Sequence, residues 1–351
     1  MKIHNKFKIF ILFLIIQCSM LADIGQRYPS YAKENIETQK NIKEKFNIYM
    51  VLWSGPTDIE KGFQAYFEEQ GIEANYIIRD CKGDAERCHA LVQEIKQTKP
   101  DLIYTWGTPA AVSIAGPIEA PHKEEYIWDI PIVSTIVSDP VFSKIIYSLD
   151  KPGRNLTGVN HLPPPDAQLN TMLSYTPFTK LGVFFVPSET FVLNGIKNLK
   201  KEAKKKNIEV SEFPYTFIIN NRVDPSKLDD VFQKIKESGI DIVYIPSGNY
   251  LSVDSKIVCD AAIKNGILIF VTTELMIKKG DPLMGLISNY INIGRFAAEK
   301  AIKILIEKVK TEEIKYETFE KFNFFINVNT MNTLKKYPPL SVIDQAQFIE
   351  K

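Results

Sequence analysis

The chain has 351 residues, 45% of them hydrophobic, and its formal net charge is +1 at pH 7. This hydrophobic content is enough for a packed core, so the composition excludes global disorder. The near-neutral charge gives no electrostatic footprint for DNA or RNA, so we expect no nucleic-acid partner.

A secretory signal peptide is predicted over residues 1–22. Lysines precede a short apolar run at residues 9–16, which is the pattern of a basic n-region followed by an apolar core. The apolar stretch that ends at Ala22 is shorter than the roughly 20 residues that a helix needs to span a bilayer. We therefore expect an exported protein, either periplasmic or tethered to the extracytoplasmic face of a membrane.

The end of the leader leaves two processing sites open. Ala22 suits the position before a signal-peptidase cut. The residues up to Cys18 resemble a bacterial lipidation box, in which Gln17 stands where a small residue is expected. Residues 23–45 are polar and charged without an apolar period, which indicates a spacer. Residues 46–351 then suit two domains of ordinary size.

Strand and helix patterns alternate along the first half of the folded part. Short apolar runs without polar alternation predict buried parallel strands, and the segments between them predict covering helices. The strands are expected over residues 46–53, 74–79, 102–106 and 130–137, and the helices over 57–70, 84–98, from 109 and from 140. These strands and helices are enough to form one complete α/β domain.

The pattern restarts after a boundary at residues 155–165, which includes three consecutive prolines. Strands are expected over 181–186, 209–215, 240–245 and 267–271, and helices over 190–206, 225–237 and 249–262. A last unit, extended at 285–290, helical at 293–309 and a strand at 322–328, could return to the first domain. Because open parallel sheets bind ligands outside the carboxyl ends of their strands, we expect the site there.

One strand–turn–helix segment, residues 101–112, has the local chemistry of an anion site. Thr108 is expected to cap the helix, and Pro109 to occupy its first position. The backbone N–H groups of Ala110 and Ala111 would then point outward at the positive end of the helix, where small side chains let a carboxylate approach. The same pattern also fits an ordinary capped corner of an α/β protein.

Three cysteines lie beyond the leader, and two of them flank a tight turn. In an oxidising compartment, Cys81 and Cys88 could form a local disulfide. The alternative is a metal site that also uses Asp84 and His89, but no second ligand pair stands at a zinc-finger spacing, so we expect no metal. Cys259 lies in an apolar helix pattern and is expected to be a buried free thiol.

Motifs of catalysis and cofactor binding are absent from the sequence. It contains no Gly-x-Gly-x-x-Gly, no phosphate loop ending in Gly-Lys-Ser/Thr, no His-Glu-x-x-His, no Cys-x-x-Cys and no Gly-x-Ser-x-Gly. We therefore expect neither an enzyme nor a bound cofactor.

Several stretches, in this order and spacing, carry a family resemblance. The first three are DLIYTWGTPAA, IPIVSTIVSDPV and LDKPGRNLTGVNHL, and KLGVFFVPSE, DIVYIPSGN and YINIGRFAAEKAIKIL follow. Their succession resembles the ABC-transporter substrate-binding proteins of the tryptophan/tyrosine-binding type. The resemblance covers about residues 46–338.

This resemblance implies the type I periplasmic-binding-protein fold: two Rossmann-like α/β lobes with parallel sheets, joined by a hinge of three crossings. The first lobe would comprise residues 46–158 and about 288–322, and the second 159–287 and about 323–351. The implied function is the solute-binding component of an ABC importer, which closes on a small ligand and hands it to a membrane permease. An aromatic amino acid is favoured as ligand, and we expect a monomer.

The resemblance also places four turns in the ligand cleft: Thr108-Pro109-Ala110, Ser138-Asp139-Pro140, Pro187-Ser188-Glu189 and Ser247-Gly248-Asn249. Two departures fall on ligand loops. Gly248 stands where many relatives carry Asp, and residues 54–58 replace a His-Pro-x-Leu-Asp start. These departures leave the ligand's identity open.

The expected ligand-binding residues combine these turns with the aromatic residues at strand ends and the last strand–helix corner. They are Trp53, Ser54, Trp106, Thr108, Pro109, Ala110, Ala111, Ser138, Asp139, Ser188, Glu189, Thr190, Ser247, Asn249, Tyr250, Thr273 and Glu274. Our hypothesis is a zwitterion whose carboxylate meets the Thr108–Ala111 segment. Its ammonium would meet Asp139 or, as second choice, Glu189. A ring would stack on one of the three aromatic residues.

Three other functions are alternatives to this one. A sensory binding module that passes closure to a receptor fits the same sequence features. A two-lobed α/β transferase lacks any catalytic constellation here. A DNA regulator of similar fold would carry a basic helix-turn-helix head, and this chain has a leader in that place.

Overall fold

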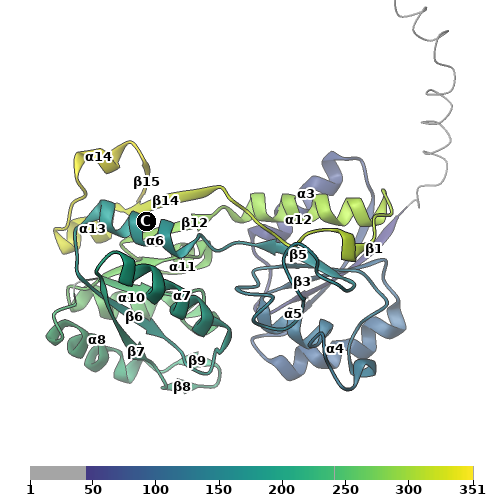
Figure 1. The fold of residues 1–351 in the computed structure, drawn as a ribbon, viewed down its shortest axis with the longest axis horizontal. Coiled ribbons are helices and arrows are strands. Elements are labelled where there is room, and N and C mark those ends of the chain that lie inside the picture. The colour runs from purple at the N-terminus through teal and green to yellow at the C-terminus, as the bar shows by residue number, and fades with distance from the viewer. Residues whose placement is uncertain (1–44, 241, 351) are drawn as a thin grey trace, which may run out of the picture. The chain divides into compact units, whose positions relative to one another are not determined.

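The computed structural model describes residues 45–240 and 242–350. The predicted leader, the two candidate processing sites and all but the last residue of the spacer lie outside the described residues. Within them, two β-sheets with their own helices form two lobes, so the expected α/β class with parallel sheets is confirmed (Figure 1). In the same range, no helix has the length and hydrophobicity that a membrane span requires.

The first lobe is built on a parallel sheet with the strand order β13-β5-β4-β3-β1-β2. Its strands are β1 (Phe46–Leu52), β2 (Ala74–Asp80), β3 (Leu102–Trp106), β4 (Ile132–Thr135), β5 (Leu156–Asn160) and β13 (Glu317–Thr318), and its helices are α3 (Asp58–Glu69), α4 (Ala85–Thr98), α5 (Thr108–Ala115) and α12 (Tyr290–Leu305). All five residues of β3 are buried, which explains why its sequence is a continuous apolar run without alternation.

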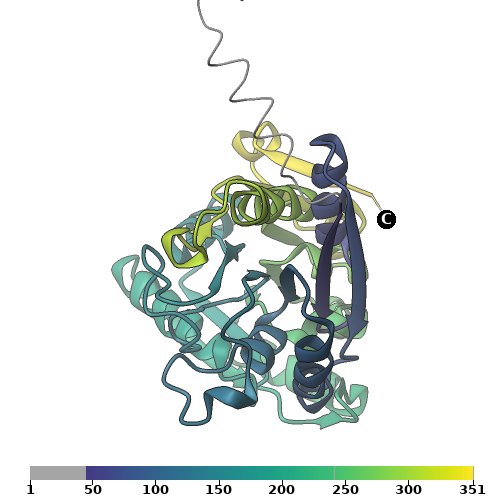
Figure 2. The same cartoon turned by 90° about the vertical axis from the view of Figure 1, so that its right-hand side faces the viewer.

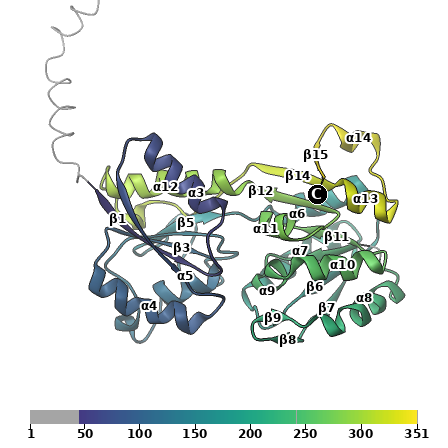
Figure 3. The same ribbon diagram turned by 180° about the vertical axis from the view of Figure 1, so that it is seen from behind.

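The second lobe is built on a sheet with the strand order β15-β14-β12-β11-β10-β6-β7, in which only the β12–β14 pair is antiparallel within the described residues. The strands are β6 (Lys180–Phe185), β7 (Glu209–Pro214), β10 (Ile242–Ile245), β11 (Leu268–Val271), β12 (Met284–Ser288), β14 (Phe322–Asn327) and β15 (Ala346–Ile349). Figure 3 shows α9, α10 and α11 beside this sheet from behind.

The second lobe carries most of the remaining elements. Its helices are α6 (Pro165–Tyr175), α7 (Phe191–Lys205), α8 (Leu228–Glu237), α9 (Asn249–Val253), α10 (Ser255–Lys264), α11 (Glu274–Lys279), α13 (Val328–Leu334) and α14 (Leu340–Ile343). Its small hairpin pairs β8 (Ile218–Ile219) with β9 (Arg222–Val223). Three short 3-10 helices complete the two lobes. The segment η2 (Pro225–Lys227) belongs to the second lobe, and η1 (Lys123–Glu125) and η3 (Thr311–Glu313) belong to the first.

Within residues 45–240 and 242–350 the chain crosses between the lobes three times, as the resemblance implied. The crossings join β5 to α6, β12 to α12, and β13 to β14. The second crossing is the shortest, because β12 ends at Ser288 and α12 begins at Tyr290. Positions near these crossings therefore lie close to both sheets.

The helix expected from residue 140 is wrong, because the structure forms turns there instead. The Asp139 carboxylate accepts a hydrogen bond from the Phe142 N–H at 2.9 Å, which caps a single turn. Lys144 then adopts a left-handed backbone with φ of +58°. A helix cannot continue through such a residue, so the chain reverses and leaves this segment as a wall at the carboxyl end of β4.

Helix α12 packs along α3 in the first lobe, and Figure 2 shows α12 nearly end-on. The two backbones meet at a pair of glycines. A Cβ added to Gly294 would lie 2.0 Å from the Ile59 carbonyl oxygen, and one added to Gly62 would lie 2.1 Å from that of Ile291. No side chain fits at either position, so glycine is required for this close approach.

We predict that Gly294→Ala lowers the free energy of unfolding by about 1–3 kcal/mol, because its methyl group would overlap the α3 backbone and force the helices apart. Thermal unfolding measures the change. The matched control is Gly195→Ala in α7, where an added Cβ meets no atom within 4 Å. That change should be neutral or stabilising by about 0.5–1 kcal/mol. Equal effects of the two substitutions would contradict the packing argument.

Candidate functional site

A cavity of about 290 Å³, called here the main cavity, lies between the carboxyl ends of strands from both sheets. The first lobe lines it with Ser138, Asp139, Pro140, Val141, Leu149, Asn160 and Thr318. The second lobe lines it with Leu162, Pro163, Pro164, Pro165, Gln168, Phe191, Val192, Gly195, Asn198, Tyr244, Pro246 and Ser247. Aliphatic, aromatic and proline side chains form most of the wall, with a few polar groups among them. This combination is typical of a small-molecule site.

A second, much smaller pocket adjoins the main cavity through a shared residue, Ser247. Its volume is about 10 Å³, and its lining comprises Ser54, Trp106, Ile136, Ser247, Gly248, Asn249, Ser252, Val253, Thr273, Leu275 and Tyr290. Such a volume holds about one water molecule. In this conformation, room for a ligand is therefore found in the main cavity and not in the small pocket.

Ser247, in the turn after β10, connects the second lobe to the hinge and to the first lobe. Its carbonyl oxygen accepts from the Ser138 hydroxyl at 3.4 Å. Its own hydroxyl is hydrogen-bonded to His161 Nε2 at 3.1 Å, in the first crossing. The Ser288 hydroxyl, at the second crossing, donates to the His161 carbonyl oxygen at 2.9 Å. Burial lowers the pKa of His161 to about 3, so this imidazole is neutral at physiological pH.

Asp139 faces the main cavity and also contacts both lobes. One carboxylate oxygen caps its own turn by accepting from the Phe142 N–H. The other accepts from the Asn194 side-chain amide at 2.6 Å, and Asn194 belongs to α7 of the second lobe. Asp139 is therefore the charged group of the cavity wall, and it is already oriented by two donors.

Glu189 is buried, with 5% of its surface exposed, and is not part of the cavity lining. Its carboxylate accepts from the Asn249 N–H at 2.5 Å, which fixes the turn after β10. A Cβ at Gly248 would lie 2.6 Å from the other carboxylate oxygen, so the carboxylate fills the space that a side chain at 248 would need. Burial raises the pKa of Glu189 to about 7.

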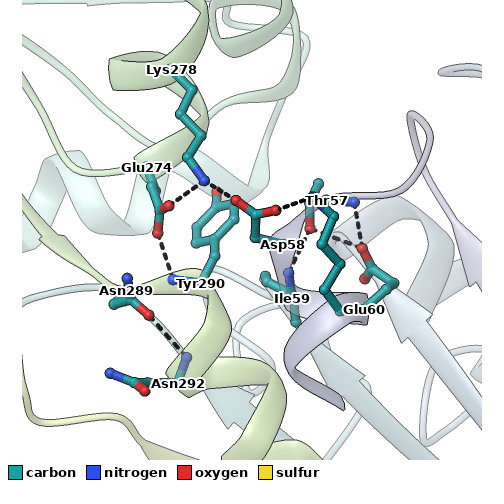
Figure 4. A network of polar contacts seen from close by, with 10 residues as sticks. Thr57, Asp58, Ile59, Glu60, Glu274, Lys278, Asn289, Tyr290 and Asn292 are labelled. Atoms are coloured by element: carbon teal, nitrogen blue, oxygen red, sulfur yellow. Dashed lines mark hydrogen bonds and ion pairs between the residues drawn. The ribbon is translucent and has the colours of Figure 1, made fainter. Parts of the chain in front are cut away.

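A polar network joins the lobes beside the second crossing (Figure 4). Lys278, in α11, forms an ion pair with Asp58 in the first turn of α3 and another with Glu274 at 2.5 Å. The second oxygen of Glu274 accepts from the Tyr290 N–H at 2.5 Å, at the start of α12. The Lys278 ammonium holds the pKa of Asp58 below its usual range. One lysine thus connects α11 of the second lobe to α3 of the first.

The structure brings together only part of the residue set expected from the sequence. Ser138, Asp139 and Ser247 line the main cavity. Ser54, Trp106, Asn249 and Thr273 line the small pocket. Neither lining includes Trp53, Thr108, Pro109, Ala110, Ala111, Ser188, Glu189, Thr190, Tyr250 or Glu274.

The local geometry corrects two details of the anion site expected at the start of α5, its cap and the direction of one N–H. Gly107, with φ of +93°, is the N-cap, and Thr108 is the first helical residue. The Thr108 hydroxyl accepts from the Ser138 N–H at 3.1 Å. The N–H of Ala111 donates to the Gly107 carbonyl oxygen at 3.1 Å, so it does not point outward as expected. Both alanine side chains of this turn are fully buried.

Other expected site residues have structural partners. Trp53 belongs to the core of the first lobe, where it packs against Gly107. Tyr250 packs against the core of the second lobe. Thr273 caps α11, and Glu274 takes part in the network at the second crossing.

Four residues of the cavity wall and of the contacts between the lobes were not expected from the sequence: Gln168, Asn194, His161 and Lys278. Their signals in the sequence are weak, because each is one polar residue among many. The sequence identifies the triple proline before α6 only as a domain boundary. In the structure, residues 163–165 also line the main cavity, together with Gln168.

The cysteine alternatives are decided by the structure, which contains a Cys81–Cys88 disulfide. Cys259 is buried and free, as expected. Across the residues with described positions, no group of three or more His, Cys, Asp or Glu residues could hold a metal ion.

One family model matches most of the chain. The family model described as "ABC transporter substrate binding protein" matches residues 47–347. The tyrosine-binding protein of Clostridioides difficile (strain R20291) is 28% identical over 329 residues, which cover 91% of this chain and 89% of that protein.

Two solved structures share the fold. A conserved domain protein from Vibrio cholerae has a TM-score of 0.75 at 20% identity, covering 88% of this chain and all of that one. The ABC domain in complex with L-Trp from Streptococcus pneumonia has a TM-score of 0.72 at 20% identity, covering 86% of this chain and 99% of that one.

The pKa of Glu189 predicts a pH-dependent stability. Burial raises the pKa of this carboxyl in the folded protein from the ordinary value of 4.5 to about 7. The folded protein therefore binds this proton more tightly than the unfolded chain does. The resulting stabilisation is complete below pH 4.5 and is lost as the pH rises through 7. We expect Glu189→Gln, which cannot titrate, to remove a fall of about 2–3 kcal/mol in the free energy of unfolding between pH 5 and pH 8.

Urea unfolding at a series of pH values tests this expectation. The difference between variant and wild type isolates Glu189 from the other buried groups, such as His161. Glu320→Gln, at an exposed position, is the matched control and should leave the pH profile unchanged. A wild-type profile retained in Glu189→Gln would show that the carboxyl does not titrate in this range.

We predict a small, salt-sensitive effect of Lys278→Met. The lysine side chain is 46% exposed, so its ion pairs with Asp58 and Glu274 are screened and contribute about 1 kcal/mol or less each. The melting temperature should fall by about 1–3 °C at low ionic strength and by less at about 1 M salt. Lys279→Met, one residue along on the exposed end of α11, should leave it unchanged. A fall of the same size at both salt concentrations would argue against an ionic origin.

Proposed function

The chain belongs to the family of ABC transporter substrate-binding proteins, and we propose that it binds an aromatic amino acid in the main cavity and delivers it to a membrane permease. The observation that carries the proposal is the position and lining of this cavity, between the strand ends of both lobes. Its volume of about 290 Å³ is close to the lower limit of small-molecule sites, about 300 Å³. The ligands named for two similar proteins, tyrosine and L-Trp, are aromatic amino acids.

Asp139 is our choice for the group that binds the ligand's ammonium. It lines the cavity, whereas the carboxylate of Glu189, the second choice from the sequence, lies outside the lining and already accepts from Asn249. The Ser247 hydroxyl is the donor that we assign to the ligand's carboxylate, because it can accept from the His161 Nε2–H and keep its own proton free. The Ser138 hydroxyl would join it by exchanging its 3.4 Å hydrogen bond to the Ser247 carbonyl oxygen for one to the ligand. These positions replace the Thr108–Ala111 turn, in which the Thr108 hydroxyl accepts from Ser138 and the Ala111 N–H donates to Gly107.

Closure of the lobes on the ligand is the proposed signal to the permease. Walls from both lobes surround the cavity, so the full set of ligand contacts forms only when the lobes come together. A ligand shifts the equilibrium between open and closed forms through contacts that are better in the closed form. The contacts Asp139–Asn194 and Asp58–Lys278 link the same two lobes without a ligand.

We further propose that the protein acts outside the cytoplasm and catalyses no reaction. The Cys81–Cys88 disulfide supports an oxidising compartment, in agreement with the leader predicted from the sequence.

Calorimetric titration tests the function. The purified protein is unfolded to release bound ligand, refolded, and titrated with the 20 L-amino acids, a sugar and a nucleoside. We expect one-to-one binding of an aromatic amino acid. Asp139→Asn should weaken it by about 10- to 100-fold, because a hydrogen-bonded charge contributes about 1.5–3 kcal/mol.

Asp230→Asn, an exposed substitution in α8, is the control and should leave the affinity unchanged. Tight binding of the sugar or the nucleoside, with no response to any amino acid, would refute the proposed ligand class. Aromatic binding that is insensitive to Asp139→Asn would refute the assignment of the ammonium site alone.

A further inference from the structure

A further hollow at the surface of the second lobe, called here the outer groove, adjoins the main cavity. Its volume is about 340 Å³, and its lining comprises Pro164, Pro165, Asp166, Asn198, Lys201 and Glu202. Pro164, Pro165 and Asn198 line the main cavity as well. The two spaces therefore meet between the start of α6 and the middle of α7, two helices that pack against each other. The proposed function uses only the main cavity.

One face of α7 forms a wall along both spaces. The residues of this helix that line one space or the other are Phe191, Val192, Gly195, Asn198, Lys201 and Glu202. They recur at intervals of three and four residues, which places them on one side of the helix. Asn194, near the start of the same helix, donates to the Asp139 carboxylate. Helix α7 thus leads from the group assigned to the ligand's ammonium to the outer groove.

Lys201 is the uncompensated charge of the outer groove. The Asp166 carboxylate forms an ion pair with Lys206 at 2.9 Å, and the Glu202 carboxylate forms one with Lys205 at 2.7 Å. Among the described residues, no ion pair or hydrogen bond involves the ammonium of Lys201. The groove therefore offers a cation to a ligand, whereas the nearby wall of the main cavity offers the anion Asp139.

The separation of these two charges indicates the length of the ligand that could contact both. Asn194, which holds Asp139, and Lys201 are seven residues apart, which is roughly 10 Å along a helix. A single amino acid spans about 3.5 Å, and an extended dipeptide spans about 7 Å. The flexible four-carbon stem of a lysine covers the remaining distance. A dipeptide can therefore bridge the two charges, and a free amino acid cannot.

We propose that the main cavity and the outer groove together bind dipeptides whose first residue is aromatic. This inference rests on the proposed function, because it keeps the ring in the main cavity and the ammonium at Asp139. The carbonyl oxygen of the peptide bond takes the place of the free carboxylate and accepts from the Ser247 hydroxyl. The second residue passes between Pro164 and Asn198, and its terminal carboxylate contacts the Lys201 ammonium.

Calorimetric titration of the wild-type protein gives the first test. The ligands are L-tyrosine, L-tryptophan, L-tyrosyl-L-alanine, L-tryptophyl-L-alanine and the C-terminal amides of the two peptides. We expect at least one peptide to bind within about 10-fold of its free amino acid or more tightly, because the ammonium and ring contacts are kept. Its amide, which lacks the terminal charge, should bind about 2- to 5-fold more weakly than the peptide, since exposed ion pairs are weak.

The second test removes the cation. Lys201→Met should lower the affinity for the peptide to that of the amide, and it should leave the affinities for the amide and for the free amino acid unchanged. The matched control is Lys204→Met, at an exposed position of α7 outside both linings, and it should leave all three affinities unchanged. Equal losses of peptide affinity in both variants would indicate a general effect of charge and would overturn the role of Lys201.

The outcomes separate the two proposals. Peptides that bind more than about 10-fold more weakly than the free amino acids would overturn the role of the outer groove and leave the proposed function intact. A peptide affinity that is unchanged in Lys201→Met would do the same. Binding of the peptides without the free amino acids would support the groove and refute the free amino acid as ligand. If neither class binds, the proposed function itself fails, and the inference about peptides fails with it.

Discussion

The contact of α12 with α3 at Gly62 and Gly294 is the packing constraint on which the two-lobed arrangement depends. Helix α12 starts two residues after β12 ends, so its position sets the direction of the second crossing. Because the two backbones touch, the first turn of α12 lies beside the start of α3. The Tyr290 N–H and the Asp58 carboxylate thereby come within reach of one pair of residues on α11, Glu274 and Lys278.

The polar groups of the main cavity serve two purposes at once. The carboxylate of Asp139 caps its own turn and accepts from Asn194 of the other lobe. Ser247 contacts Ser138 of the first lobe and His161 of the hinge. A ligand that binds these groups therefore acts on the atoms that already connect the lobes. In the proposed function, this sharing would couple ligand capture to closure without a separate structural relay.

Most of the fold could be predicted from the sequence, and the exceptions have physical reasons. The apolar runs of β1, β3 and β10 identify buried parallel strands, because both faces of those strands are covered. The edge strand β13 has two residues, too few for any periodicity, and gave no signal. The turn at Asp139 was mistaken for a helix start because the same side-chain cap opens both structures. The left-handed Lys144 decides between them.

For the candidate site, the sequence predicts which turns lie near the cavity. It does not predict which contacts the residues of those turns make. Ser138, Asp139 and Ser247 follow strands, so the carboxyl-end rule for parallel sheets places them at the cavity. Thr108 and Ala111 follow a strand as well, yet their polar groups are bonded within the first lobe. The rule locates an edge of the sheet and cannot tell which groups on that edge remain available.

The sequence by itself determined the fold class, the order of strands and helices, and the turns from which a site could be built, since these follow from periodicity and capping over a few neighbouring residues. Tertiary structure alone decided which buried polar groups are satisfied. Glu189 accepts from Asn249, 60 residues away, and the buried amide oxygen of Gln168 has no partner among the described residues. Pairing at such separations depends on where the two sheets carry their turns, and no local pattern in the chain records that position.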